Sequence, residues 1–470
     1  MPTRGIISHG TYLPFRRLDR STIAVVAGTG GGKGTRTVAG YDEDSTTLGV
    51  EAARAALRPV PTTRPDLLVF SSVTPAYVDK TNATTIHAAL VLPPEVNAWD
   101  ANGSVRSAVG ALRLGVERSG TTLVVTADLR SGRPGSAEES SGGDAAAAIV
   151  FGDGTDAPVI AEYLGGATRA EEFLDRWRTP GETFSKTWEE RFGETRYVPL
   201  GQQVWKEGLD AAGLTADAVT RVVIAGTHGR AAGSLGRSLG LDAGVMADDL
   251  TARIGNPGAA QPALLLSAAL ESAAPGAVIA LLVLSDGADV LFFRATDAIT
   301  SFRVDRPLAA QLDRGGPIAY GKFLAWRGAL AVEPPRRPEP ARVSASAATR
   351  AEHWKFGFVG SRDRASGALH LPPTRISREG GAIDDMEDAP MADVRGTIAT
   401  FTVDRLAYSP SPPVVFAVID FDGGGRSPLE LTDVDVDDLA IGGRVEMTFR
   451  RLSTADGIHN YFWKARPVRG

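Results

Sequence analysis

Short apolar runs alternate with helical stretches along most of the chain, and this alternation restricts the fold more than any other feature. Residues 66–73 and 121–127 are apolar runs of strand length, and the small-residue pattern of 105–116 between them is typical of a helix. The same succession returns later, with a helical pattern over 262–272 and a strand pattern over 277–284. Strands alternating with helices predict an α/β fold, and two such halves predict an internal duplication.

The segment Arg169–Trp205 between the two halves is charged and aromatic. We interpret it as an insertion that either covers a site or an interface, or forms a surface excursion packed by its own aromatic side chains. The glycine-rich segment Ser21–Thr37 does not fit a phosphate-binding loop, because Lys33 is followed by Gly34 rather than by Ser or Thr. We therefore expect an ordinary flexible loop there.

Beyond residue 333 the composition changes. Pro334–Arg350 is rich in proline and then in small residues, which indicates a semi-extended linker. Strand patterns follow, with glycine turns between them, and they predict a small β-barrel. These strands are expected at 394–407, 414–421, 445–451 and 459–465. The predicted division is 1–165 and 166–333 for the two α/β halves, 334–350 for the linker and 351–470 for the last domain.

Composition excludes several classes of protein. The net charge of −6 gives no basic surface for nucleic acid, and no apolar run reaches the roughly 20 residues that a membrane span needs. The first residues lack a secretory signal, so we expect a soluble, cytoplasmic protein. The chain contains 0 cysteines, which excludes disulfides, thiolate nucleophiles and thiolate metal ligands.

Several stretches carry a family resemblance. In the α/β part they are YDEDSTTLGVEAARAAL, DANGSV, GDAAAAIVFGDG, IGNPGAAQPALLLSAALE and PGAVIALLVLSDGADV. This part resembles 3-hydroxy-3-methylglutaryl-CoA synthase of the archaeal type and, more distantly, ketoacyl-carrier-protein synthase III. The last part, from ADVRGTIATFTVDRLAY to GIHNYFWKARPV, resembles the DUF35-type OB-fold proteins that accompany these synthases. The resemblance implies a duplicated, five-layer thiolase-like fold followed by a small all-β OB-fold domain.

The chemistry of the family requires a cysteine nucleophile, a histidine and a glutamate general acid/base. The resemblance places Val105 at the cysteine, Ala225 at the histidine and Ser72 at the glutamate. An isopropyl group cannot attack a thioester, so the usual acyl-enzyme is not expected. Ser104 flanks the lost cysteine and would be a substitute nucleophile only with a base to activate it.

Other polar residues remain candidates for a site. The resemblance puts His228 on the loop that enters the family's active site, and Asn256 at an asparagine that helps to form a polar cradle. Each residue also has a plain local interpretation, His228 as a structural hydrogen-bonding residue and Asn256 as a turn residue. Arg230 falls where the family has a lysine associated with CoA, and could meet a phosphate or be a solubilising charge. Tyr77 is a further hydroxyl candidate.

The resemblance also implies a zinc ribbon with two CxxC pairs ahead of the barrel. Asp363 and Ser366 stand at the first pair, and Ser377 and Gly380 stand at the second. No thiolate remains, and His370 alone cannot make a structural zinc site, so we expect no metal and no cofactor.

Two functions follow from these substitutions. The first is an enzyme that binds an acyl-CoA or an acyl-carrier protein and makes or breaks a C–C bond by aldol or retro-aldol chemistry, with His228 as base, Asn256 as oxyanion donor, and Ser72 and Ser104 as further candidates. The second is a catalytically inactive partner subunit of an active thiolase-fold enzyme. Either function fits a homodimer or a heterodimer with a thiolase-fold protein, and neither involves nucleic acid or a membrane. A polar cleft around Val105, His228 and Asn256 would favour the enzyme, and an apolar plug there would favour the partner.

Overall fold

The computed structural model describes residues 3–469, which form two compact units. The first unit runs to residue 323, apart from the short segments 40–43 and 85–92. The second unit comprises these two segments and the chain from residue 324 onward. Among the described residues, no helix is long and apolar enough to cross a membrane.

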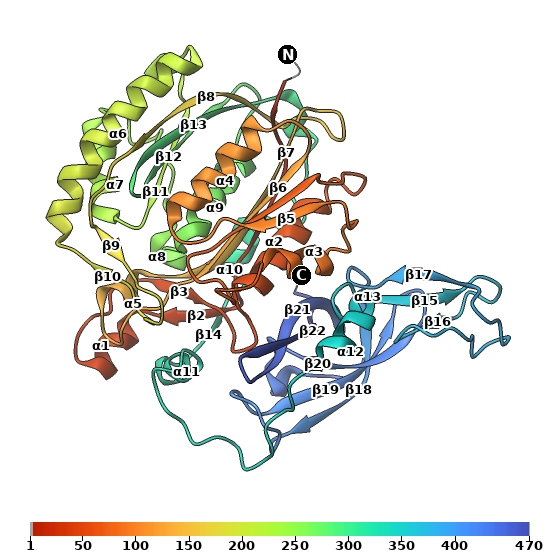
Figure 1. Ribbon diagram of the computed structural model, residues 1–470. Coiled ribbons are helices and arrows are strands. Elements are labelled where there is room, and N and C mark those ends of the chain that lie inside the picture. Colours follow the sequence, from red (N-terminus) through yellow and green to blue (C-terminus); the bar gives the residue numbers. More distant parts are fainter. Residues whose placement is uncertain (1–2, 470) are drawn as a thin grey trace. The chain divides into compact units, whose positions relative to one another are not determined.

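One mixed sheet of nine strands forms the framework of the first unit (Figure 1), in the order β11-β12-β13-β8-β1-β7-β6-β4-β5. The strands are β1 (Gly5–Tyr12), β4 (Leu67–Ser71), β5 (Asn97–Asp100), β6 (Thr122–Leu129), β7 (Asp144–Gly152), β8 (Ala161–Ala170), β11 (Arg221–Gly226), β12 (Val278–Leu284) and β13 (Gly287–Ala295).

The strand pairing repeats in the two halves of this sheet. In the first half β4 is parallel to β5 and to β6, β6 is antiparallel to β7, and β7 is antiparallel to β1. In the second half β11 is parallel to β12, β12 is antiparallel to β13, and β13 is antiparallel to β8. A parallel bridge between Val222 and Met246 takes the place that β5 has in the first half. The halves join where β1 pairs with β8, and the predicted duplication is confirmed.

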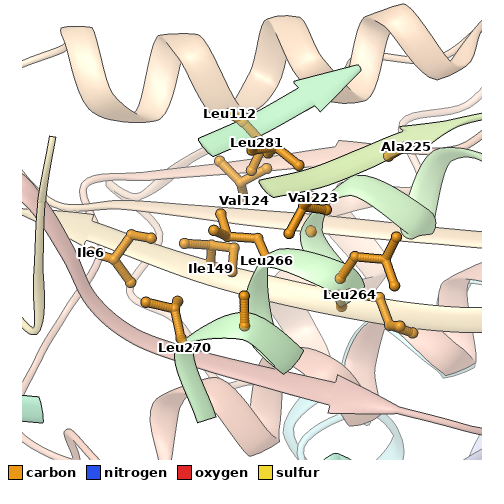
Figure 2. Close-up of a cluster of buried hydrophobic side chains, with 14 of the residues drawn as sticks. Ile6, Leu112, Val124, Ile149, Val223, Ala225, Leu264, Leu266, Leu270 and Leu281 are labelled. Carbon is orange, nitrogen blue, oxygen red and sulfur yellow. The ribbon is translucent and has the colours of Figure 1, made fainter. Parts of the chain in front are cut away.

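Five layers follow from the helix contacts. Helices α4 (Val105–Glu117) and α9 (Gln261–Glu271) pack between the two halves, and a single apolar cluster fills this layer (Figure 2). Helix α2 (Ser45–Leu57) covers the outer face of the first half, and α6 (Glu190–Ala212) and α7 (Gly229–Ser238) cover the outer face of the second. The labelled members of the cluster are Ile6, Leu112, Val124, Ile149, Val223, Ala225, Leu264, Leu266, Leu270 and Leu281.

Local sequence explains the helices on either side of the first half. Asp44 accepts the amide of Thr47, and the Thr47 hydroxyl accepts the amide of Asp44, so a capping box begins α2. In α4 the buried residues Val105, Val109, Leu112 and Val116 recur every three or four positions, which aligns them on one face.

In the first unit, two sequence-based expectations are corrected by the structure. The glycine-rich segment begins with helix α1 (Ser21–Ala27), and the loop starts only where Gly28 takes a left-handed conformation with φ of 70°. The expected insertion is shorter than Arg169–Trp205, because its last part belongs to α6. Tyr197 and Trp205 are 3% and 6% exposed and pack on the sheet, so their aromatic character is that of a buried helix face.

The remaining elements of the first unit are short, and α3 and α11 continue past its limits. They are β2 (Arg16–Asp19), β3 (Thr35–Val38), α3 (Ala83–Ala89), α5 (Ala137–Ser141), β9 (Arg176–Trp177), β10 (Lys186–Thr187), α8 (Thr251–Ile254), α10 (Leu308–Asp313), β14 (Gly316–Pro317) and α11 (Tyr320–Trp326).

The second unit has a closed barrel with strand order β18-β19-β20-β22-β21, as the sequence predicted. The prediction missed β20, whose six residues include Pro428. Two helices and a three-stranded sheet precede the barrel. The first helix occupies the last six residues of the expected linker 334–350, so the extended part of that linker is shorter than predicted. The elements are α12 (Ala345–Arg350), α13 (Glu352–Lys355), β15 (Val359–Asp363), β16 (Leu369–His370), β17 (Met386–Pro390), β18 (Gly396–Asp404), β19 (Val414–Phe421), β20 (Arg426–Leu431), β21 (Arg444–Ala455) and β22 (Ile458–Pro467).

Candidate functional site

Apolar side chains occupy both positions at which the resemblance expects a catalytic cysteine and histidine. Val105 begins α4 and is 4% exposed, while Ala225 near the end of β11 is 1% exposed. Both belong to the apolar cluster between the two halves. This part of the first unit therefore has the character of a packed core.

Ser104 precedes Val105, and its hydroxyl group does not cap α4. It is the residue before the helix, and its side chain makes no capping hydrogen bond. Ser104 and Ser107 line a pocket of about 280 Å³, together with Arg106, Arg113 and Asp289. Arg106 contacts Asp289 at 3.1 Å across this pocket.

The side-chain amide of Asn256 is hydrogen-bonded within the protein, and one partner is the backbone of Gly226, the residue after Ala225. Its Nδ2 atom donates to the carbonyl oxygen of Gly226 at 2.8 Å and to Oε1 of Gln261 at 3.1 Å, and its Oδ1 atom accepts the amide of Gly258 at 2.9 Å. Gln261 Oε1 also accepts the Gly226 amide at 2.9 Å. Both amide hydrogens of Asn256 therefore have protein partners in this conformation.

His228 also has both polar atoms in use. Its Nδ1 atom accepts the amide of Ala231 at 3.0 Å, which caps α7, and its Nε2 atom lies 2.8 Å from the carbonyl oxygen of Glu190. Because a carbonyl can only accept, Nε2 carries the hydrogen and the ring is the neutral Nε2–H tautomer. The ring of Tyr197 packs edge-on against it at 5.7 Å.

Arg230 in α7 and Tyr77 in the loop after β4 are both at least partly exposed. The Arg230 side chain is 45% exposed, and its Nε atom contacts Oε2 of Glu194 at 2.5 Å. Ser234 also donates to Glu194. Tyr77 is half-buried in the loop after β4, where the Lys80 ammonium lies 5.9 Å from its ring centre.

Ser72 is fully buried and donates to Oδ1 of Asp128 at 2.9 Å. The same oxygen accepts the Val73 amide at 2.7 Å, and Oδ2 accepts the Ala259 amide at 2.6 Å. Burial raises the pKa of Asp128, although these hydrogen bonds and the charge of Arg130 act in the opposite direction. Asp128 thus joins the strand ends of the first half to the second half. Sequence reasoning missed it, because an aspartate at the end of a strand has no distinguishing pattern.

Three of the four positions expected to have lost zinc ligands are brought together by hydrogen bonds. Oδ2 of Asp363 accepts the Ser366 hydroxyl at 2.6 Å, and Oδ1 accepts the Ala365 amide at 2.9 Å. Hydrogen bonds from Ser366 and then Ser377 lower the pKa of Asp363 to about 2. One carboxylate and two hydroxyls do not supply the donors that tetrahedral zinc prefers, so these residues do not fit a zinc ion. No group of three acidic, histidine or cysteine residues able to hold a metal occurs within 3–469.

A buried ion cluster lies in the second unit, and no local sequence pattern predicts it. The side chains of Arg450 and Lys464 are 0% exposed. Arg450 contacts Glu43 at 2.9 Å, and Lys464 contacts Asp42 at 3.1 Å and Glu430 at 2.7 Å. Burial opposes the charge of Asp42, but Lys464 and Arg450 outweigh it and lower the pKa of this carboxyl. Burial likewise opposes the charge of Lys464, but Asp42 and other anionic neighbours raise its pKa.

Comparison with known proteins decides the family of the first unit. The hydroxymethylglutaryl-CoA synthase of Aeropyrum pernix is 30% identical over 345 residues, which cover 70% of this chain and 95% of that protein. The chain belongs to the hydroxymethylglutaryl-CoA synthase family. The synthase of Pyrococcus horikoshii is 28% identical over 310 residues, covering 64% of this chain and 88% of its own. The resemblance that the sequence motifs indicated is thereby confirmed, in a family member without cysteine.

Solved structures and a family model agree with both parts of the fold. MvaS in complex with 3-hydroxy-3-methylglutaryl coenzyme A has a TM-score of 0.59 at 19% identity, covering 72% of this chain and 94% of that chain. The 3-oxoacyl-(acyl carrier protein) synthase III of Pseudomonas aeruginosa has a TM-score of 0.53 at 19% identity, covering 63% and 98%. Residues 389–450 match the C-terminal OB-fold domain of ChsH2. The chain is therefore a thiolase-like α/β domain followed by an OB-fold domain.

Proposed function

We propose that this chain is a catalytically inactive, thiolase-fold partner subunit that acts with an active homologue. The observation that carries this proposal is the shared burial of Val105 and Ala225 in one apolar cluster. An apolar, packed core at these positions offers neither a nucleophile nor a base. The hydrogen bonds of His228, Asn256 and Ser72 support the same function, because each side chain holds a neighbouring backbone or side-chain group.

The test is enzymatic reconstitution. The chain is assayed alone with acetyl-CoA, acetoacetyl-CoA and a β-hydroxyacyl-CoA, and then in co-expressed pairs with the cysteine-bearing thiolase-superfamily proteins of the same genome. We expect no turnover by the chain alone. In one pair we expect a stable complex of defined stoichiometry, whose turnover exceeds that of the homologue alone. Condensation or cleavage by the chain alone would overturn the proposal, and so would the lack of any complex or rate increase across all pairs.

A second candidate function is the binding of an acyl thioester, with retro-aldol cleavage as its chemistry. The uncommitted Ser104 hydroxyl favours it, because this group lines a pocket of about 280 Å³ that also contains Arg106 and Arg113. Relatives of the same fold have been solved with CoA and with 3-hydroxy-3-methylglutaryl coenzyme A. Retro-aldol cleavage needs a base for the hydroxyl and donors for the thioester enolate, and needs no thiol.

Thermal melting with and without CoA ligands tests this second function. A ligand that binds only the folded state stabilises it by about 2.7 kcal/mol at a hundredfold excess over Kd. A dose-dependent rise in Tm with one acyl-CoA, and a smaller rise with CoA, would support thioester binding. Unchanged melting with CoA, acetyl-CoA, a longer acyl-CoA and an acyl-carrier protein would eliminate this candidate.

A further inference from the structure

Residues 171–192, which run from the end of β8 through the first turn of α6, form an aromatic segment in which Phe173 packs on the core of the second half. Every apolar side chain of this segment is at least partly exposed, and Asp175 is its one buried residue. Leu174 is 50% exposed, Trp188 55% and Phe192 38%. Exposed apolar groups gathered in one segment call for a functional explanation.

Polar contacts hold this segment in place. Arg176 makes two hydrogen bonds to the Glu138 carboxylate, at 2.8 and 2.7 Å. Glu138 also binds the buried Arg130 at 2.6 Å, and Arg178 donates to the carbonyl oxygen of Val73. Burial on its own disfavours the charged carboxylate, but Arg130 and Arg176 outweigh it and lower the pKa of Glu138 to about 2.

The anchoring points lie beside the strand ends of the first half. Val73 follows Ser72, and the Val73 amide binds Asp128. Arg130 comes two residues after Asp128, just past the end of β6. The segment therefore lies against the site around Ser72 and Asp128, where the resemblance expects the general acid/base.

We propose that residues 171–192 are a strap that closes over the ends of β4 and β6 and opens as a unit while both halves stay folded. The Glu138 carboxylate, which binds Arg176 of this segment, holds the strap closed, and we call it the latch. A segment that buries little apolar surface opens at a free-energy cost far below that of global unfolding. The latch pairs are partly open to solvent, with Arg176 20% and Glu138 18% exposed, so salt weakens them. The inference goes beyond the proposed function and does not depend on it.

Hydrogen–deuterium exchange of the full chain tests the strap. We expect amides of 171–192 to exchange at least about tenfold faster than those of β8 and of α6 beyond residue 192, and to exchange faster still in 1 M than in 0.05 M NaCl. Glu138→Gln should accelerate their exchange by a further factor of about ten, the effect of losing one charge-assisted pair. Exchange in β6 and β7 should stay unchanged.

Glu207→Gln is the matched control. Glu207 pairs with Arg169 at 2.6 Å on the same unit, in an exposed contact that does not involve the strap. This variant should leave 171–192 unaffected. Equal protection of 171–192 and its flanking elements in the wild type would overturn the inference, as would equal effects of the two variants. If Glu138→Gln does not fold, the wild-type measurements in 0.05 M and 1 M NaCl test the role of Glu138. Exchange in 171–192 that does not depend on the salt concentration would contradict that role.

Discussion

The Nε2 atom of His228 donates a hydrogen bond to the carbonyl oxygen of Glu190, 2.8 Å away, and so ties the start of α7 to the first turn of α6. Residues 38 positions apart are joined by this contact. The imidazole that the family resemblance made a candidate base therefore has a structural role in this conformation, with its other nitrogen capping α7.

Replacing His228 should lower the stability of the fold and should have no direct effect on thioester binding or turnover. His228→Ala removes an N-cap and one further hydrogen bond, so we expect it to lower the free energy of unfolding by about 1–2 kcal/mol. His228→Asn keeps a good capping side chain and should recover part of this loss. Urea unfolding measures both variants. A variant that loses thioester binding or turnover at unchanged stability would show instead that the imidazole acts chemically.

A cysteine at position 105, where the resemblance puts the family's nucleophile, should not by itself form an acyl-enzyme. Val105→Cys is a small change in volume within the apolar cluster and should cost less than about 1.5 kcal/mol. The thiol would be buried among apolar groups, which raise its pKa, and it would have no base beside it. Intact-mass analysis after incubation with acetyl-CoA should show no acetyl adduct, while alkylation of the unfolded protein confirms that the thiol is present. An adduct on the folded variant would mean that an accessible catalytic cleft survives.

The hydrogen bonds around Asp363 should make the second unit sensitive to acid and indifferent to chelators. The pKa of the Asp363 carboxyl is about 2 in the folded chain and about 3.9 in the unfolded chain, so folding favours the charged form of this group. The stabilisation is present above the unfolded pKa and is lost as the pH falls from about 4 towards 2. Melting curves across this range should show a drop in Tm that Asp363→Asn makes smaller, with Asp388→Asn, on the exposed part of β17, as the control.

A lowered Tm after EDTA treatment would contradict this account of the Asp363 cluster. It would imply that the segment holds a metal despite its donor set. Metal analysis of the untreated protein separates the two results, because a structural zinc ion would be present in stoichiometric amount.

The buried ion cluster should be costly to break. Lys464→Met removes one buried cation from the carboxylates of Asp42 and Glu430, and we expect a loss of about 3–5 kcal/mol in denaturant unfolding. Arg444→Met is the control, because Arg444 and Asp422 form an exposed pair of the same barrel, 45% and 54% accessible, and solvent screens such a pair. Similar losses of unfolding free energy in the two variants would show that the buried cluster stabilises the fold no more than an exposed ion pair does. Adding Asp42→Asn to Lys464→Met should recover part of the loss.

Local patterns predicted most of the fold. The apolar runs of β4, β6 and β12 and the small-residue faces of α4 and α9 are properties of short windows, and periodicity alone reveals them. The strand β20 was missed because its six residues include a proline, which demotes a strand pattern. The aromatic residues Tyr197 and Trp205 were assigned to an insertion because the sequence does not show that they pack on a sheet.

The candidate site was predictable only in part. The absence of a thiolate nucleophile is a matter of residue identity, so the sequence settles it, and the resemblance puts Val105 at the family's cysteine. The hydrogen bonds of His228 and Asn256 involve both nearby residues and residues far away in the chain, and the sequence does not show the distant ones. Gly226 lies 30 positions from Asn256.

The sequence by itself thus determined the elements, their duplication, the added barrel and the loss of thiolate chemistry, because these depend on side-chain identity and short-range periodicity. Tertiary structure decided which polar groups are available for chemistry and which are committed. Asp42 and Thr432, 390 positions apart, meet in a hydrogen bond of 2.9 Å that no local pattern announces. A hydrogen bond or a buried ion pair requires its two groups to meet in space, and only the folded chain brings them together.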